Sequence, residues 1–172
     1  NDVNSNQAVK NLRVTFHSFN VDSMTQIQDT NADWSNYKLH LSLSLNVINT
    51  SSDDAQSQGL EGKISLDTIS EPHVSLPFKS FKVLGGESQI ETARTELNSE
   101  THHKTIQYIL TQYVNEDRIK TEIGLNLLYT IAGRDGSLSL PSLQQAIPTK
   151  GQLSEEKRNQ WSQVLESGVF DN

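Results

Sequence analysis

The side chains best able to do chemistry in this sequence are its histidines, and two of them, His102 and His103, are adjacent. Neighbouring residues on a helix point about 100° apart. They therefore cannot chelate one ion as histidines at i and i+4 can. Glu100 is the nearby carboxylate that could complete a metal site, so we interpret the pair as a solvated first helical turn. The other histidines stand singly on presumed strand or loop positions at the surface or rim: His17, His40 and His73.

A glycine-centred segment from Arg134 to Leu140 resembles the middle of a calcium-binding loop. Such a loop needs oxygen ligands at positions 1, 3 and 5, a glycine at position 6 and a carboxylate at position 12. With Gly136 at position 6, the four ligand positions fall on Ile131, Gly133, Asp135 and Ser142. Only Asp135 is suitable, so we interpret Arg134-Asp135-Gly136 as a tight hairpin turn.

Other catalytic signatures are missing from the sequence. There is no cysteine and no Gly-x-Ser-x-Gly elbow, so no nucleophile can be named. The glycine pairs lack the lysine and the helix start of a phosphate-binding loop. Carboxylates are dispersed at charged positions: Glu91, Glu96, Glu116, Asp117 and Glu122. The sequence thus predicts no catalytic, cofactor-binding or metal-ligating residues. An enzyme whose site is assembled from distant residues stays an alternative. A cleft that joins a carboxylate of shifted pKa to His40 or His102 would support it.

Composition excludes further classes of protein. The chain has 172 residues and a net charge of −7, and 34% of it is hydrophobic. An acidic chain with scattered lysines and arginines is unlike a nucleic-acid-binding surface. No apolar run approaches the ~18 residues of a membrane-spanning helix. Asn49-Thr50-Ser51 matches a glycosylation sequon, but so short a match is expected by chance in a chain this rich in Asn, Ser and Thr.

The elements that must position any site are mostly strands. Alternation is strict over residues 39–48, with Leu39, Leu41, Leu43, Leu45 and Val47 predicted to face the core. A second alternating run covers 119–131, with Leu138 and Leu140 returning after the turn. Residues 12–21 alternate with a change of parity that indicates a bulge near Ser18. Pro72 and Pro77 place the strand of residues 74–78 at a sheet edge, and Gly85-Gly86 is interpreted as a hairpin turn.

Two segments have helical periodicity. An amphipathic helix of about 15 residues is predicted from Asn98 or Ser99 as N-cap, with one apolar stripe. The stripe comprises Ile106, Ile109, Leu110, Tyr113 and Val114. A short helix starts at Ser154 and buries Trp161, Val164 and Leu165.

These elements predict a mainly β protein, an antiparallel β-sandwich with one amphipathic helix and a short C-terminal helix. Residues 1–10 are expected to be a flexible tether, 11–140 the sandwich domain, and 141–172 a C-terminal extension that Pro141 and Pro148 break up at its start. Residues 22–36 are interpreted as a polar loop, with Trp34 and Tyr37 packing at its end.

The order of elements resembles the water-stress and hypersensitive-response domain, known also as the late-embryogenesis-abundant (LEA) type 2 or LEA-like domain. In that family the long strand ends in Asn-Pro and is followed by a segment of the form Leu-x-Gly-x-Ile-x-Leu. Asn49 and the segment Leu60–Leu66 match, whereas Thr50 replaces the proline. The resemblance covers about residues 11–140 and implies a fibronectin-III-like β-sandwich, no catalytic residues, and a stress-protective or interaction role.

Bacterial members of this family are commonly exported and often lipid-anchored. The resemblance therefore implies a periplasmic or outer-membrane-anchored protein, tethered through a cysteine upstream of residue 1. Two hypotheses remain open for the function. One is a non-enzymatic β-sandwich module of the cell envelope that binds a protein partner or acts in stress protection. The other is a carrier of an apolar ligand, in which the helix stripe covers a cavity against the Leu39–Val47 face.

Overall fold

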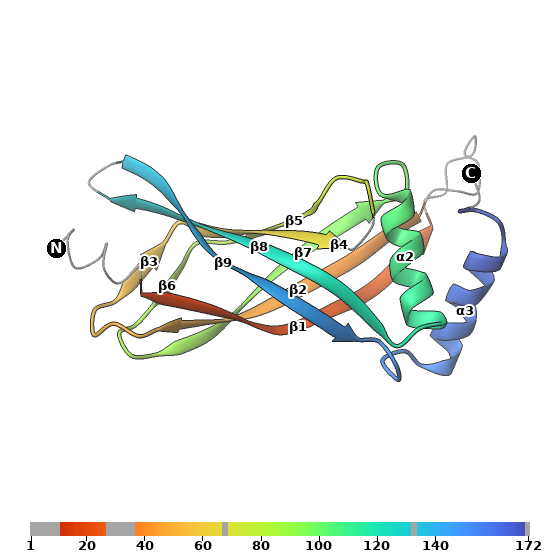
Figure 1. The fold of residues 1–172 in the computed structure, drawn as a ribbon, viewed down its shortest axis with the longest axis horizontal. Helices are drawn as coiled ribbons and strands as arrows, with labels where there is room; N and C mark the ends of the chain where they lie inside the picture. The colour runs from red at the N-terminus through yellow and green to blue at the C-terminus, as the bar shows by residue number, and fades with distance from the viewer. Residues whose placement is uncertain (1–10, 27–36, 67–68, 132–133, 171–172) are drawn as a thin grey trace.

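The computed structural model describes residues 11–26, 37–66, 69–131 and 134–170. Its strands form two antiparallel layers packed as a β-sandwich, with two helices at one end (Figure 1). One layer has the order β1-β2-β7, comprising β1 (Leu12–Gln26), β2 (Tyr37–Asn49) and β7 (Ser88–Asn98). The other has the order β5-β4-β8-β9, comprising β4 (Gly59–Leu66), β5 (Val74–Phe78), β8 (Arg118–Ile131) and β9 (Arg134–Pro148). A short pair joins β3 (Ala55–Ser57) to β6 (Phe81–Val83). The mainly β, antiparallel sandwich predicted from the sequence is confirmed.

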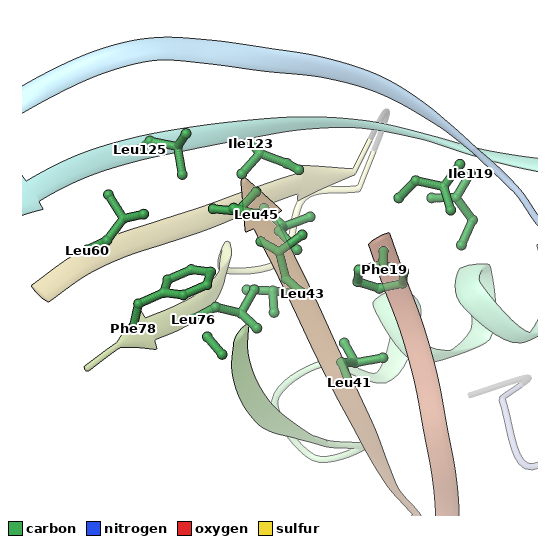
Figure 2. Close-up of a cluster of buried hydrophobic side chains, with 14 of the residues drawn as sticks. Phe19, Leu41, Leu43, Leu45, Leu60, Leu76, Phe78, Ile119, Ile123 and Leu125 are labelled. Atoms are coloured by element: carbon green, nitrogen blue, oxygen red, sulfur yellow. The ribbon is translucent and has the colours of Figure 1, made fainter. Parts of the chain in front are cut away.

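The core lies where the two layers face each other. The five alternating residues predicted for β2 are at most 1% exposed, and Ile119, Ile123, Leu125 and Leu127 of β8 are also buried. Figure 2 shows Leu43 and Leu45 from one layer pointing toward Leu76 and Ile123 from the other. Period-two alternation thus assigned the buried faces of β2 and β8 correctly.

β1 is longer than its sequence pattern indicates. The register with β2 shifts between Phe16 and Ser18, which confirms the expected bulge, and shifts again between Val21 and Ser23. Each bulge inserts an extra residue and reverses the parity of the side chains that follow. The strand therefore continues to Gln26, and the prediction of a loop from residue 22 is wrong for 22–26. The rest of that loop, Trp34 and the tether at residues 1–10 lie outside the described residues.

Two predictions based on prolines have opposite outcomes. β5 is an edge strand, as Pro72 and Pro77 indicated. Pro141, in contrast, breaks nothing: β9 runs through it to Pro148, and the boundary expected at residue 140 falls inside this strand. An edge strand tolerates proline at a bulge, and the register with β8 is irregular between Ile123 and Leu125, opposite this position.

The two predicted hairpin turns need correction. Arg134, Asp135 and Gly136 are strand residues that pair with the end of β8, so the turn does not lie there. Gly85-Gly86 does form a turn, with Gly86 at a φ of 75° and Glu87 N–H donating to the Leu84 carbonyl. The strands on its two sides are not partners, because β6 pairs with β3 and β7 pairs with β2.

Two helices, α2 (His103–Val114) and α3 (Glu155–Glu166), pack together at one end of the sandwich. Tyr113 and Trp161 make an edge-to-face contact with ring centroids 5.7 Å apart. Burial, with a smaller contribution from Asp22, raises the pKa of Tyr113 to about 12. α3 begins as predicted, with the Ser154 hydroxyl accepting from Lys157 N–H. Within the described ranges, no helix has the length and apolarity needed to cross a membrane.

α2 begins three to four residues later than predicted, with His102 rather than Ser99 or Asn98 at the N-cap. The Asn98 carboxamide accepts from Glu100 N–H at 2.6 Å, and the Ser99 hydroxyl accepts from Tyr37 N–H at 2.9 Å. Both side chains are therefore used in the turn that precedes the helix. His102 occupies the N-cap position and makes no side-chain capping bond.

Candidate functional site

The N-terminus of α2 is capped by a residue from another part of the chain. Glu71 accepts hydrogen bonds from Lys104 N–H at 2.9 Å, from Thr105 N–H at 2.6 Å and from the Thr105 hydroxyl at 2.8 Å. Burial raises the pKa of this carboxyl, but those bonds and the charge of His102 outweigh it, so the pKa lies below its ordinary value of 4.5. A carboxylate at a helix N-terminus is favoured by the helix dipole.

This arrangement argues for a structural role of Glu71. A carboxylate with a lowered pKa is a weak base near neutral pH. Its oxygens already accept three protein hydrogen bonds, and the nearby His102 Nε2 lies 3.2 Å from the Pro72 carbonyl oxygen. A carboxylate of shifted pKa does lie near His102, as a composite active site would require, but it serves as the helix cap.

The expectation of a solvated histidine pair is wrong for His103. Its Nε2 is buried and has no hydrogen-bond partner in the part of the chain that the structure describes. Its ring packs on Phe170, with centroids 5.1 Å apart. His103 therefore contributes to the packing between the start of α2 and the segment after α3. No group of three or more His, Cys, Asp or Glu residues suited to a metal ion occurs among the described residues.

His40 lies in a hydrogen-bonded group on the outer face of the β1-β2-β7 layer. Its Nε2 is 3.3 Å from the Thr25 hydroxyl, and its Nδ1 is 3.3 Å from Glu96 Oε1. Lys38 Nζ lies 3.6 Å from the other Glu96 oxygen. In space, a hydroxyl, an imidazole and a carboxylate follow one another in the order of a catalytic triad. The contacts are long, however, and they join cross-strand neighbours on a solvated face, which is the usual environment of such pairs.

Other polar side chains of this outer face are also paired with one another. Ser44 and Thr92 hydroxyls lie 2.7 Å apart, Asn46 donates to Thr15, and Ser42 donates to Asp22. A cleft of about 260 Å³ beside His40 is lined by Asp22, His40, Leu41, Arg94, Thr95 and Glu96. Because most polar groups here bond to one another, few are left to recognise a ligand.

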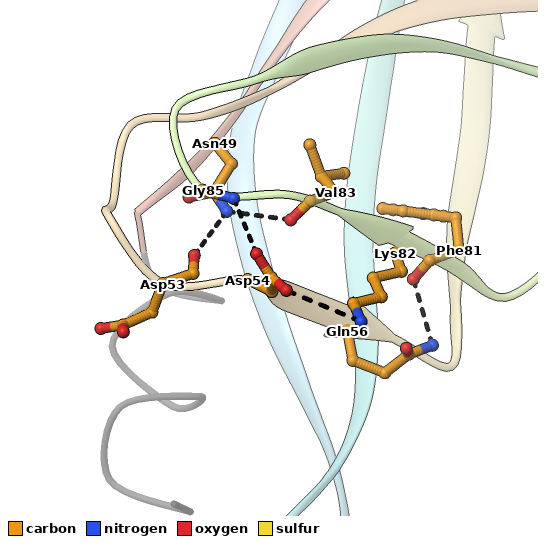
Figure 3. Close-up of polar contacts among 8 residues, drawn as sticks. All are labelled: Asn49, Asp53, Asp54, Gln56, Phe81, Lys82, Val83 and Gly85. Carbon is orange, nitrogen blue, oxygen red and sulfur yellow. Dashed lines mark hydrogen bonds and ion pairs between the residues drawn. The ribbon is translucent and has the colours of Figure 1, made fainter.

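Asn49, at the end of β2, is a buried structural side chain (Figure 3). Its Nδ2 donates to the carbonyls of Asp53 at 2.8 Å and Val83 at 3.0 Å, and its Oδ1 accepts from Ser51 N–H. It thereby ties the end of β2 to the β3 and β6 segments. Because the side chain is buried and its nitrogen already donates two hydrogen bonds, that nitrogen is not accessible for glycosylation in the folded chain.

Gly85 belongs to the same structural corner. Its N–H donates to the Asp54 carboxylate at 3.0 Å, and Asp54 also pairs with Lys82. A Cβ at this position would collide with the Ser52 backbone, so glycine is required by close approach of the two chain segments.

The β5-β4-β8-β9 layer carries a larger cleft of about 600 Å³, which we call the outer cleft. It is lined by consecutive residues of three neighbouring strands: Ser65 and Leu66 of β4, Lys120, Thr121 and Glu122 of β8, and Gln144, Gln145 and Ala146 of β9. The register places Ser65, Glu122 and Gln144 in one cross-strand row. Lys120 and Ala146 form a second row, two residues along.

Alternation of side chains determines the shape of this cleft. The row between the two outward rows, which contains Leu66 and Thr121, turns its side chains toward the interior, and Thr121 is buried. Strand backbone therefore forms the floor, and the outward rows form the sides. Sequence reasoning did not identify this site. The alternation of β8 does indicate that Lys120 and Glu122 point outward. It does not indicate that β4, β8 and β9 are neighbours in the sheet.

Three outward polar side chains of the outer cleft are unpaired. Within the described residues, the side chains of Lys120, Glu122 and Gln144 make no hydrogen bond or ion pair. Ser65 does have a partner, since its hydroxyl lies 2.6 Å from His73 Nδ1. The cleft thus presents a cation, a carboxylate and a carboxamide that remain available for a ligand.

The stripe of α2 belongs to the core. Ile106, Ile109, Leu110 and Tyr113 are 0–4% exposed and lie in the same buried cluster as the inward residues of β2. Val114 is partly buried against that cluster. The apolar residues that a carrier would use to contact its ligand are therefore engaged in side-chain packing.

Comparison with known proteins gives likenesses of fold only. No protein-family model matches the chain, and no curated protein matches it. The chain is similar to a solution structure of a protein assigned as late embryogenesis abundant (LEA), with 15% identity, coverage of 80% of this chain and 70% of that one, and a TM-score of 0.44. It is also similar to a protein from Archaeoglobus fulgidus (11% identity, 79% and 98% coverage, TM-score 0.42). A third similar structure is assigned as ApaA from Bordetella pertussis (13% identity, 80% and 94% coverage, TM-score 0.40). The assignment to the β-sandwich class rests on the sheet topology described above.

Proposed function

We propose that this chain is a non-enzymatic, LEA-like β-sandwich module of the cell envelope, which binds a protein partner or acts in stress protection. The observation that carries the proposal is the open edge of β1. This strand has 15 residues, and in the described part of the chain it hydrogen-bonds to β2 alone. Exposed strand edges are templates for strand addition by another chain.

The composition of β1 supports such a role. Natural edge strands are commonly protected by prolines, by lysines or by short length. β1 contains no proline and no lysine, and its protective features are two bulges and the charged residues Arg13 and Asp22. Val14 and Phe16 are only partly buried against the core, so a partner segment lying along β1 would gain apolar contacts as well as backbone hydrogen bonds.

The partner-binding proposal is tested by gentle purification of the protein from its host envelope in mild detergent, followed by native mass spectrometry. We expect a co-purifying protein in fixed stoichiometry. Thr15→Lys and Asn20→Lys place charges at exposed positions on β1 and should abolish the complex, whereas Ser75→Lys, an exposed position on the edge strand β5, should retain it. Loss with all three variants would contradict recognition through β1.

The stress-protection proposal needs a separate measurement. A labile enzyme is dried and rehydrated with this protein or with an equal mass of serum albumin, and its remaining activity is assayed. We expect greater recovery than albumin provides. Equal recovery, together with a bare mass in the first experiment, would contradict the proposed function. A retained lipid mass would favour an apolar carrier instead.

The envelope location is tested by determining the sequence that precedes residue 1 in the full-length gene product, and by cell fractionation. We expect an export signal followed by an anchoring cysteine, and recovery of the protein with the envelope. A full-length product without such a cysteine would contradict the lipid anchor, and recovery in the cytoplasmic fraction would contradict the location.

A further inference from the structure

The outer cleft differs from the opposite face of the sandwich in one respect. On the β1-β2-β7 face, hydroxyl, carboxamide and imidazole groups bond to one another. In the outer cleft, three polar side chains of different chemistry line one hollow without bonding to each other. Arg94 on the β1-β2-β7 face is also without a hydrogen bond or ion pair among the described residues, but only in the outer cleft do an unpaired cation, carboxylate and carboxamide share one hollow.

The chemistry of the cleft constrains its ligand. Glu122 only accepts hydrogen bonds, Lys120 only donates them, and Gln144 does both. An anionic ligand would meet the Glu122 carboxylate, and a cationic ligand would meet Lys120. An apolar ligand would remove these groups from water without replacing their hydrogen bonds, which is costly.

A neutral ligand with several hydroxyl groups satisfies all of these requirements. Each hydroxyl both donates and accepts, so it can bond to Lys120 or to Glu122 without a fixed register. A peptide backbone, whose donors and acceptors alternate in fixed order, lacks this freedom. The volume of about 600 Å³ lies within the range of small-molecule sites. We propose that the outer cleft binds a saccharide of one to three units.

The row Ser65, Glu122, Gln144 would provide most of the polar contacts. These residues lie directly opposite one another on three adjacent strands, a spacing of roughly 5 Å between neighbours. Ser65 is fixed by its contact with His73. Lys120 reaches the ligand from the second row, where the small Ala146 leaves room. Leu66 turns its side chain toward the core, so Ala146 is the one apolar side chain in the outward rows, and the affinity is expected to be weak.

The test is a titration of the full chain, labelled with ¹⁵N, with trehalose, maltotriose and N,N′,N″-triacetylchitotriose, followed by amide chemical shifts. At least one saccharide should give saturable shifts confined to residues 65–66, 120–122 and 144–146. Lys120→Met and Glu122→Gln should each weaken binding about tenfold. Glu96→Gln, a carboxylate change on the opposite face, should leave binding unchanged.

Several outcomes would overturn the inference. One is no saturable shift with any of the three saccharides; another is shifts scattered over both faces and linear in concentration, as a solvent effect would give. A third is an equal response of the same amides to glycerol or to triglycine. These outcomes concern the β5-β4-β8-β9 layer, whereas β1 belongs to the other layer, so they leave the partner-binding proposal to be judged by the β1 variants.

Discussion

At the residue scale, single polar side chains hold segments together that strand pairing does not join. Asn49 is 1% exposed, and its single carboxamide links the end of β2 to Asp53, just before β3, and to Val83 of β6. Asparagine suits this position because a carboxamide can donate twice and accept once.

Asn49→Ala should destabilise the fold by about 2–4 kcal/mol, because it leaves the carbonyls of Asp53 and Val83 and the amide of Ser51 without their partner. Urea denaturation measures the loss. Asn46→Ala, on the exposed face of the same strand, is the control and should cost less than about 0.5 kcal/mol. Equal losses would contradict the assignment of Asn49 as a structural tie.

Glu71 predicts a pH dependence of stability. Its pKa is lowered in the folded state, so its contribution is present above its ordinary pKa of 4.5 and is lost as pH falls through the lower folded value. Glu71→Gln should cost about 1 kcal/mol at pH 7, as loss of a helix cap does. The difference between wild type and variant should shrink below pH 4.5 and vanish at lower pH. Chemical denaturation of both proteins across this pH range measures the difference in free energy of unfolding. A difference that does not change with pH would exclude a role for the charge of Glu71.

At the element scale, strict alternation predicted β2 and β8 well. It failed where a bulge reversed the parity, as at Asp22 in β1, and where proline was taken as a break, as at Pro141 in β9. The start of α2 was misplaced because its cap comes from Glu71, about 30 positions away in the chain. Local sequence contains no signal for such a distant partner.

The assignment of the buried face of β2 has a direct test. Leu43 is fully buried between the layers, so Leu43→Ala should cost roughly 2–5 kcal/mol. Ser44→Ala changes the adjacent residue on the outer face and should cost at most about 1 kcal/mol, since it loses only the exposed contact with Thr92. A loss under about 1 kcal/mol for Leu43→Ala would show that the core face is wrongly assigned.

At the scale of the whole molecule, the fold class was predictable and the candidate site was not. Alternation and helical periodicity are local, so they indicate a β-sandwich with two helices. The outer cleft depends on β4 lying beside β8, which pairs Ser65 with Glu122 across more than fifty positions of sequence. Outward polar residues on a strand are common, and only the sheet order shows which of them share one hollow.

The division of the chain at residue 140 can be tested by truncation. A chain ending at Leu140 loses the half of β9 that pairs with Arg118 to Ile123, including buried Ile147, and should not fold cooperatively. A chain ending at Lys150 keeps β9 and loses α3 with buried Trp161; it should fold but be less stable by roughly 3–5 kcal/mol or more. Circular dichroism and urea denaturation separate the two. Cooperative folding of the shorter chain would support the boundary at residue 140.

The pairing of β4 with β8 also orders events during synthesis on the ribosome. β1, β2 and β7 are all translated by residue 98, so one layer can assemble while its leucine-lined face still has only β4 and β5 to cover it. β8 and β9 pair from Ile131 and Arg134 outward, so they can form as a local hairpin before docking. The last third of the chain thus covers the core. A nascent chain paused before residue 118 exposes apolar surface that a holding chaperone would bind.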